Sequence, residues 1–241
     1  MELYNAIIRK VGEELGSSSP RVYSYDPAKA WQDSGESELV MLRDAAFELG
    51  GDDKPAANFS CVTSDETLVA RDEILVYGKD LQAISTSVPF ARIAICLTEE
   101  MQVDGIEDTE PIFRAIQDID FVKYHVFPKG YMVRTSTENN REQVRISKEA
   151  LSQGITFEAV GADYIRRFKQ NERIKAVKLI FVTAADADYK ALQKNAKDVM
   201  DITMTLSKIL EGMPTDCNSC TLKPICDEVE GMKEMHFGQK K

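Results

Sequence analysis

Four short β-prone runs follow one another in the first half of the chain, and no helical segment separates the first three of them. Turn-forming stretches such as GGDDKP and SDET lie between the runs, which cover residues 45–49, 59–63, 73–77 and 92–97. Parallel neighbours need a long crossover between strands, usually a helix. The spacing therefore predicts an antiparallel or mixed sheet.

Helical patterns lie on both sides of these runs. Apolar residues recur four apart at Leu3, Ile7, Val11 and Leu15, which predicts an amphipathic helix that stops at Gly16. Further helices are expected at 109–119, 147–154, 161–171 and 186–210, extended chain at 124–137, and a strand at 177–183. The expected fold class is α+β: a mixed or antiparallel sheet flanked by helices, with a short C-terminal extension that carries cysteines.

One compact α+β body is expected, with an addition at each end. Residues 1–40 are predicted to be an N-terminal helix and loop, with a short turn of helix at 28–31. Residues 41–212 are the predicted α+β domain, and residues 213–241 a cysteine-rich, metal-binding tail.

Charge and hydropathy argue against two kinds of partner. The 30 basic and 40 acidic side chains give a net charge of -10, so nucleic acid is not expected as a partner, because phosphate binding needs a basic surface. A membrane is not expected either, since no apolar run approaches the roughly 20 residues that span a bilayer. The first residues lack the basic segment of a signal peptide, which makes the cytoplasm the expected compartment.

Three of the five cysteines gather in DCNSCTLKPIC, residues 216–226. A CxxC turn brings the thiolates of Cys217 and Cys220 to one side, and Cys226 is near enough to join them. Three interpretations stay open: an iron–sulfur cluster, a structural zinc ion, or reduced thiols in a tail.

The remaining ligand candidates are weaker. His236 or a carboxylate could complete a zinc site, although an isolated histidine is also an ordinary surface residue. Cys61 and Cys96 lie in the middle of apolar runs, where buried structural thiols are expected. His125 falls in the stretch predicted to be extended, where packing is its expected role.

Basic residues gather in two runs of this acidic chain. The first includes Arg166, Arg167, Lys169 and Arg173 and is a candidate patch for an anion, such as a phosphate group, or for an acidic protein surface. The second consists of Lys129, Arg134, Arg141, Arg145 and Lys148. For both runs, solvated faces with local ion pairs are the alternative interpretation.

Several stretches resemble, in order, the acetyl-CoA synthase β-subunit family of the CO dehydrogenase/acetyl-CoA synthase complex. They are AAFELGGDDKPAANF (45–59), EILVYGKDLQ (73–82), VPFARIAICL (88–97), PIFRAIQDIDFVKYHVFPKGYMVRT (111–135), VRISKEALSQGITFEAVGADYI (144–165) and VKLIFVTAADADYKAL (177–192). The CxxC motif completes the order. The resemblance covers the family's middle domain and the beginning of its metal region, over about the last four-fifths of the chain.

The resemblance implies a metal centre at the cysteines. In the family, the CxxC opens a set of four cysteines that hold a 4Fe–4S cluster, and a later Cys-Gly-Cys helps to hold two nickel ions. Carbon monoxide and a methyl group from a corrinoid protein join there, and coenzyme A takes the acetyl group. Cys217 and Cys220 match cluster ligands, and Cys226 matches with a shorter gap. No fourth cysteine follows, and no Cys-Gly-Cys occurs, so the nickel site is not encoded in this chain.

The function expected from the resemblance is therefore that of a subunit, or truncated relative, of this β subunit. It would bind an iron–sulfur cluster and act with CO dehydrogenase, acetyl-CoA synthase or corrinoid subunits in acetyl-CoA synthesis or cleavage. Because the family's N-terminal region and C-terminal catalytic domain are not expected here, the chain would not be catalytic alone. The basic patch would then suit coenzyme A. The alternative is a non-catalytic zinc or iron–sulfur scaffold that docks a partner protein.

Overall fold

The computed structural model describes residues 2–16, 19–51, 53–99, 109–136 and 140–210. The helices are α1 (Glu2–Leu15), α2 (Thr109–Phe121), α3 (Lys148–Ser152), α4 (Phe157–Phe168) and α5 (Tyr189–Leu210). The strands are β1 (Arg21–Ser24), β2 (Ala45–Leu49), β3 (Ala56–Thr63), β4 (Glu73–Tyr77), β5 (Phe90–Thr98), β6 (Tyr131–Thr135), β7 (Glu142–Ser147) and β8 (Ile174–Val182). Short 3-10 helices are η1 (Pro27–Lys29), η2 (Leu42–Asp44), η3 (Leu81–Ala83) and η5 (Val122–Tyr124).

The larger sheet has the strand order β1-β4-β8-β5-β3 in the described part of the chain. Strand β3 is parallel to β5 and β4 is parallel to β8, whereas β8 is antiparallel to β5 and β1 is antiparallel to β4. The predicted α+β class and mixed sheet are confirmed. Between the parallel strands β3 and β5, the chain forms β4, which pairs with β8. The connection between β3 and β5 therefore contains another strand of the same sheet.

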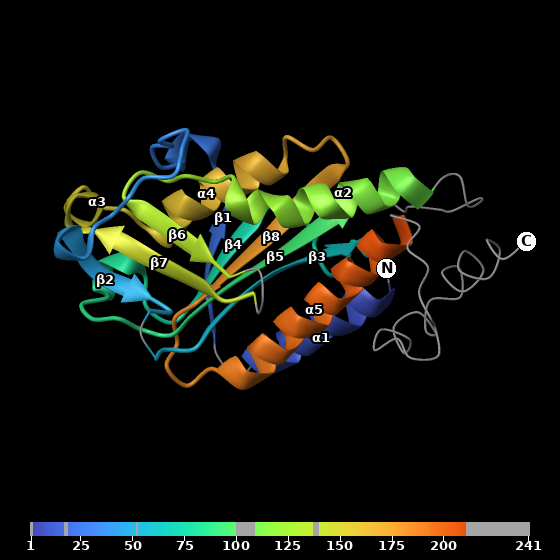
Figure 1. The fold of residues 1–241 in the computed structure, drawn as a ribbon, viewed down its shortest axis with the longest axis horizontal. Helices are drawn as coiled ribbons and strands as arrows, with labels where there is room; N and C mark the ends of the chain where they lie inside the picture. The colour runs from blue at the N-terminus through green and yellow to red at the C-terminus, as the bar shows by residue number, and fades with distance from the viewer. Residues whose placement is uncertain (1, 17–18, 52, 100–108, 137–139, 211–241) are drawn as a thin grey trace, which may run out of the picture.

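Helices pack on both faces of the larger sheet (Figure 1). Helices α1 and α5 lie side by side against β3, and the Thr63 hydroxyl in β3 donates a 2.6 Å hydrogen bond to Oδ1 of Asn5 in α1. Helix α4 packs on β4 and β8, so closely that a Cβ added to Gly161 would lie 2.8 Å from the Ile74 side chain. Every residue of β3 and β5 is buried, which is typical of strands covered on both faces.

The smaller sheet is antiparallel, with the order β2-β7-β6. Along β7 the side chains of Glu142, Val144 and Ile146 are buried and alternate with partly exposed ones, as a strand with one face on a core requires. The buried face of this sheet lies against β3 and β5 of the larger sheet.

A fully buried ion pair joins the two sheets. Arg92 in β5 donates to both carboxylate oxygens of Glu142 in β7, over 2.9 Å from Nε and 2.6 Å from Nη2, and both side chains have no exposed surface. The Asn58 amide in β3 donates to the same carboxylate. The Arg92 guanidinium also lies 4.2 Å from the centroid of the Tyr164 ring in α4. These contacts fix how the sheets stack.

Several predicted boundaries are confirmed and others are wrong. Strands β2 and β4 have the predicted bounds, and Ser147 caps α3 as expected. Residues 21–24, predicted to be loop, form the edge strand β1, and β7 was not predicted. The 124–137 stretch is not uniformly extended: His125 follows the 3-10 turn η5 and does not lie in a strand. Helix α4 begins at Phe157, four residues before the predicted start, because Thr156 caps it.

No helix in the described ranges is both long enough and apolar enough to cross a membrane.

Candidate functional site

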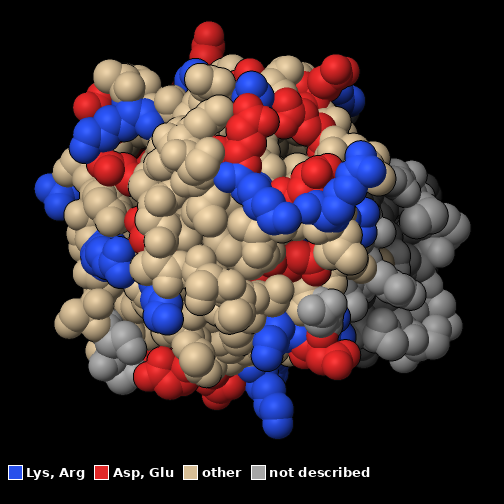
Figure 2. Space-filling view, turned by 90° about the vertical axis from the view of Figure 1, so that its left-hand side faces the viewer, with Lys and Arg blue, Asp and Glu red and all other residues tan. Residues whose placement is uncertain are grey.

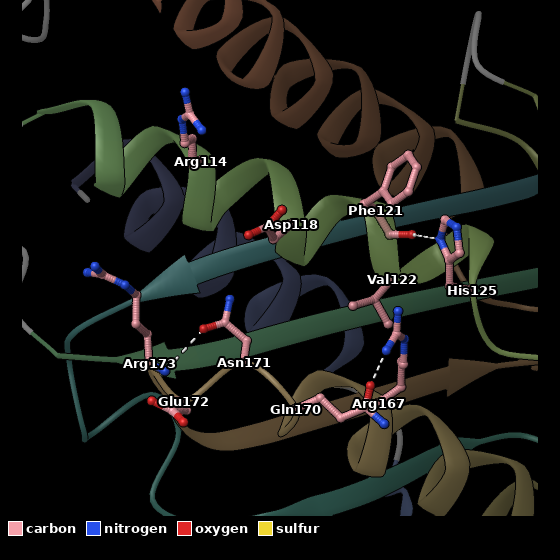
Figure 3. A pocket seen from close by; sticks show the side chains of 10 residues that line it. All are labelled: Arg114, Asp118, Phe121, Val122, His125, Arg167, Gln170, Asn171, Glu172 and Arg173. Carbon is pink, nitrogen blue, oxygen red and sulfur yellow. Dashed lines mark hydrogen bonds between the residues drawn. The ribbon is translucent and has the colours of Figure 1, made fainter.

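A cationic pocket of about 630 Å³ opens between α2 and the connection from α4 to β8 (Figure 3). Its lining residues are Arg114, Asp118, Phe121, Val122, His125, Arg167, Gln170, Asn171, Glu172 and Arg173. A volume of this size is in the range that holds a small-molecule ligand.

The local structure explains why two segments supply the walls. Arg114, Asp118 and Phe121 are spaced four and three residues apart on α2, so they lie along one helical face. On the opposite wall, α4 ends just after Arg167, and Oδ1 of Asn171 accepts a 3.1 Å hydrogen bond from the backbone N–H of Arg173. This Asx turn leads the chain into β8 and places Arg173 at the pocket rim.

The charge of the pocket favours an anion. It contains three arginines against the two acids Asp118 and Glu172. The Arg167 guanidinium is held by the side-chain carbonyl of Gln170 on the next turn. Figure 3 shows the Arg167 and Arg173 side chains turned to opposite sides, so each arginine offers its own site for an anionic group such as a phosphate.

Two aromatic side chains, Phe121 and His125, line the pocket at the C-terminal end of α2. The Phe121 side chain is 57% exposed, and its ring centroid lies 4.3 Å from that of His125. The Nδ1 atom of His125 is 3.0 Å from the Phe121 carbonyl oxygen, which fixes the imidazole against the helix end. Figure 3 shows the Phe121 ring pointing away from Arg114 and Arg173, so it forms a separate part of the lining, where its exposed ring offers a face on which a planar ring can stack.

The structure divides the basic patch predicted from sequence. Arg167 and Arg173 line the pocket, whereas Arg166 and Lys169 are held in ion pairs elsewhere. Arg166 lies 2.7 Å from Asp163 and 3.6 Å from Asp33, and Lys169 lies 2.7 Å from Asp72. The alternative interpretation, local ion pairing, therefore holds for these two.

Arg114 and the Phe121–His125 ring pair are parts of the pocket that sequence reasoning missed. The available signal was the spacing of Arg114, Asp118 and Phe121 along one predicted helix. That signal says nothing about which other segment lies opposite.

The second basic run has structural contacts. Arg145 pairs with Glu48 in β2, and Lys148 donates 2.8 Å to the Arg43 carbonyl. Arg141 donates to backbone carbonyls of the 50–54 turn. The Arg145 contact is an ion pair, and the Lys148 and Arg141 contacts are hydrogen bonds to backbone carbonyls; together they hold β2, β7 and the nearby turns in place.

Asp163 is the acid with the most perturbed environment near the patch. Burial raises its pKa from 3.8 to about 7, although Arg166 opposes the shift. Its second oxygen, Oδ2, is buried and has no hydrogen-bond partner among the residues described. The folded chain therefore retains a proton on Asp163 up to about pH 7 that the unfolded chain releases near pH 4.

The Asp163→Asn variant should therefore change how stability depends on pH. Between pH 4 and pH 7 the folded state of the parent binds the extra proton, so its free energy of unfolding falls as pH rises. The variant should lack this decline and gain at most about 4 kcal/mol over the parent at pH 8 relative to pH 4, because the pKa of Asp163 differs by about three units between the folded and unfolded chain. Urea unfolding across this range measures the difference. Arg166→Gln should shift the parent's decline to higher pH, and parallel profiles for parent and D163N would contradict the assignment.

The cysteines fall into two groups. Cys217, Cys220, Cys226 and His236 lie outside the described residues. Cys61 and Cys96 are buried in β3 and β5, as predicted, and burial raises the pKa of both thiols. A thiol that resists ionisation is a poor metal ligand. Within the described ranges, no group of three or more His, Cys, Asp or Glu side chains is placed to hold a metal ion.

Comparison with known proteins identifies the family. No curated protein matches the sequence. The family model described as the CO dehydrogenase/acetyl-CoA synthase complex beta subunit matches residues 31–187, about two thirds of the chain. This range includes both sheets apart from β1, and both walls of the cationic pocket. The chain therefore belongs to the family of the CO dehydrogenase/acetyl-CoA synthase complex beta subunit.

Proposed function

We propose that this acetyl-CoA synthase-type subunit binds a 4Fe–4S cluster through Cys217, Cys220 and Cys226. It would act with partner chains of the complex in acetyl-CoA synthesis or cleavage. The observation that carries the proposal is a CxxC motif with a third cysteine close behind it, in a chain of this family. Thiolates are the soft donors that iron–sulfur clusters use, and a partner chain or His236 could supply the fourth ligand.

The two cysteines within the described residues, Cys61 and Cys96, support this assignment. Both have raised thiol pKa values and are buried in the larger sheet, so they do not compete for the metal. Cluster ligation therefore depends on the cysteines of residues 217–226. When bound, a cluster supplies electron-transfer capacity and a thiolate-anchored metal centre. No Cys-Gly-Cys occurs in residues 1–241, so the proposal covers the iron–sulfur cluster and assigns no nickel ligand.

The cationic pocket is the proposed site for coenzyme A. Arg167 and Arg173 would bind its phosphate oxygens, and Arg114 would add charge from the opposite wall. The exposed ring of Phe121 offers a stacking face for the adenine. The combination of arginines and an exposed aromatic ring is what favours a nucleotide-like phosphate ester over a simple anion.

Metal analysis of protein purified without oxygen tests the cluster. About four irons per chain, and a brown absorbance spectrum, are expected. Cys217→Ala and Cys220→Ala should each lose most of the iron while the circular dichroism spectrum stays unchanged. Cys96→Ala is the matched control, because it removes a thiol that is buried in the sheet, and it should retain the iron.

Two other results would contradict the proposed iron–sulfur cluster. A colourless protein with one zinc per chain would favour the second candidate, a non-catalytic zinc scaffold, for which three cysteines and His236 form a suitable ligand set. Protein with neither metal, in which alanine at the three cysteines changes nothing, would refute both assignments.

A further inference from the structure

A segment of the N-terminal region crosses α4 next to the buried carboxyl group of Asp163. We call this segment, residues 26–34, the covering segment; it contains η1, which packs on α4 (Figure 1). The Trp31 N–H donates a 3.2 Å hydrogen bond to the Ala159 carbonyl, one turn before Asp163, and also interacts with the Asp163 carboxyl group. Asp163 is only 2% exposed. The covering segment therefore helps to keep this carboxyl group away from water.

The other side of the covering segment is attached to the turn that precedes β6. The Trp31 Nε1–H donates 2.9 Å to the Lys129 carbonyl, and the Lys129 N–H donates 2.7 Å to the Gln32 carbonyl. The Ser34 N–H donates 2.9 Å to the Phe127 carbonyl. The accepting carbonyls do not titrate, so a response to pH has to come from side chains between the segment and α4.

One guanidinium lies between two carboxyl groups at that contact. Arg166 Nη2 is 2.7 Å from Asp163 Oδ1 and 3.6 Å from Oδ2 of Asp33 in the covering segment. The second oxygen of Asp163, Oδ2, is buried and has no hydrogen-bond partner among the described residues. While Asp163 is protonated, the charge of Arg166 balances Asp33 alone. Once Asp163 ionises, Arg166 faces two carboxylates, and a desolvated charge develops beside the covering segment.

Other titratable groups do not change this balance near pH 7. Tyr25 and Tyr164 interact with Asp163, and burial raises the pKa of both, so they stay neutral. Charged groups on elements packed against α4 have ion pairs of their own: Lys29 of η1 with Glu158, Lys123 of η5 with Asp120, and Glu73 of β4 with Lys178 of β8. Figure 2 shows the end of the molecule that carries α3 and β2, where acidic and basic side chains are interspersed. Local pairs, rather than a surface of one sign, therefore set the electrostatics.

The position of the covering segment is linked to the proton on Asp163. In the closed state, burial raises the pKa of Asp163 to about 7, Arg166 lowers it and Asp33 raises it. If the segment leaves α4, Asp163 meets water and Asp33 moves away, so this pKa falls toward its ordinary value of 3.8. The closed state therefore binds the proton more tightly. Its extra stability is complete below about pH 4 and is lost as pH rises to about 7.

We propose that Asp163, Arg166 and Asp33 form a pH-sensitive contact, which holds the covering segment on α4 while Asp163 is protonated and releases it more often once Asp163 ionises. This conformational device is independent of the proposed iron–sulfur cluster and of the proposed coenzyme A site.

Hydrogen exchange of the Trp31 indole tests the contact in the full chain. Trp31 is the only tryptophan, so nitrogen-15 labelling of tryptophan gives one indole signal by NMR. When closing is faster than exchange, base catalysis alone raises the exchange rate by about tenfold per pH unit, and release of one proton on opening adds up to about another tenfold. The parent should show this extra rise between about pH 5 and pH 7, and Asp163→Asn should lack it.

Two further variants separate the titration from simple loosening of the segment. Glu158→Gln removes the other side-chain contact, with Lys29, and is the matched control: exchange should be faster at each pH, but the extra rise should remain. Asp33→Asn, at an exposed side chain, should end the extra rise at lower pH, because the pKa of Asp163 falls without the neighbouring anion.

Either of two results would overturn the proposal. The first is the same pH dependence of exchange in the parent and D163N. The second is a Trp31 indole that exchanges as slowly as the amide of Ile93 in the buried strand β5, since the covering segment would then open only when the whole chain unfolds.

Discussion

Replacing Arg92 with leucine should lower the free energy of unfolding by about 3–5 kcal/mol, because it leaves the buried Glu142 carboxylate without its cation. Both side chains are fully buried, so water cannot compensate for the loss. Urea unfolding monitored by circular dichroism measures the change. Arg9→Leu removes an exposed ion pair with Asp65 and should cost less than about 1 kcal/mol.

A double variant shows whether the loss comes from the uncompensated charge. Arg92→Leu combined with Glu142→Met removes both charges and should recover a large part of the stability, since apolar residues of similar size often replace a buried pair without loss. A cost below about 1 kcal/mol for Arg92→Leu alone would show that the pair contributes little to the stacking of the sheets.

Reversing the charge of Arg173 should weaken the proposed binding of coenzyme A by about tenfold or more, because the proposed charge-assisted contact between this arginine and a phosphate group would become a repulsion. Arg167→Glu on the same wall should have a similar effect. Titration calorimetry at low and high salt measures both variants, and the difference from the parent should shrink as salt screens the phosphate.

The matched control for these variants is Lys190→Glu, an equal change of charge at an exposed residue of α5 that does not line the pocket. Equal affinity in the parent, R173E and R167E would remove the pocket from the proposed function. It would leave the proposed cluster untouched, because that depends on Cys217, Cys220 and Cys226.

Local patterns in the sequence predicted the separate elements well and their assembly poorly. Strands β2 and β4 were predicted to the residue because alternating or continuous apolar runs end at clear turns. Strand β7 was missed because its first inward position is Glu142, and a charged residue indicates an exposed site unless its partner is known. Strand β1 is short, mostly exposed and at the edge of its sheet, so it has no apolar pattern.

Contacts between residues far apart in the sequence determine the strand pairing and the make-up of the pocket, and local sequence patterns do not predict such contacts. The parallel pairing of β3 and β5 depends on β4 crossing to β8, which no local pattern encodes. The same limit applies to the pocket: Arg167 and Arg173 were found as part of a basic run, but only the folded chain separates them from Arg166 and Lys169. The cysteines at 217–226 remain a prediction from spacing and resemblance.

The bidentate contact between Arg92 and Glu142, shared with Asn58, also limits how this chain can diverge. A change at one of the three positions leaves a desolvated charge or amide at the centre of the molecule. A substitution at one of these positions is therefore tolerated only when the other two positions change as well. Across distant homologues, the three positions should therefore covary, and an apolar trio would be as acceptable as the charged one.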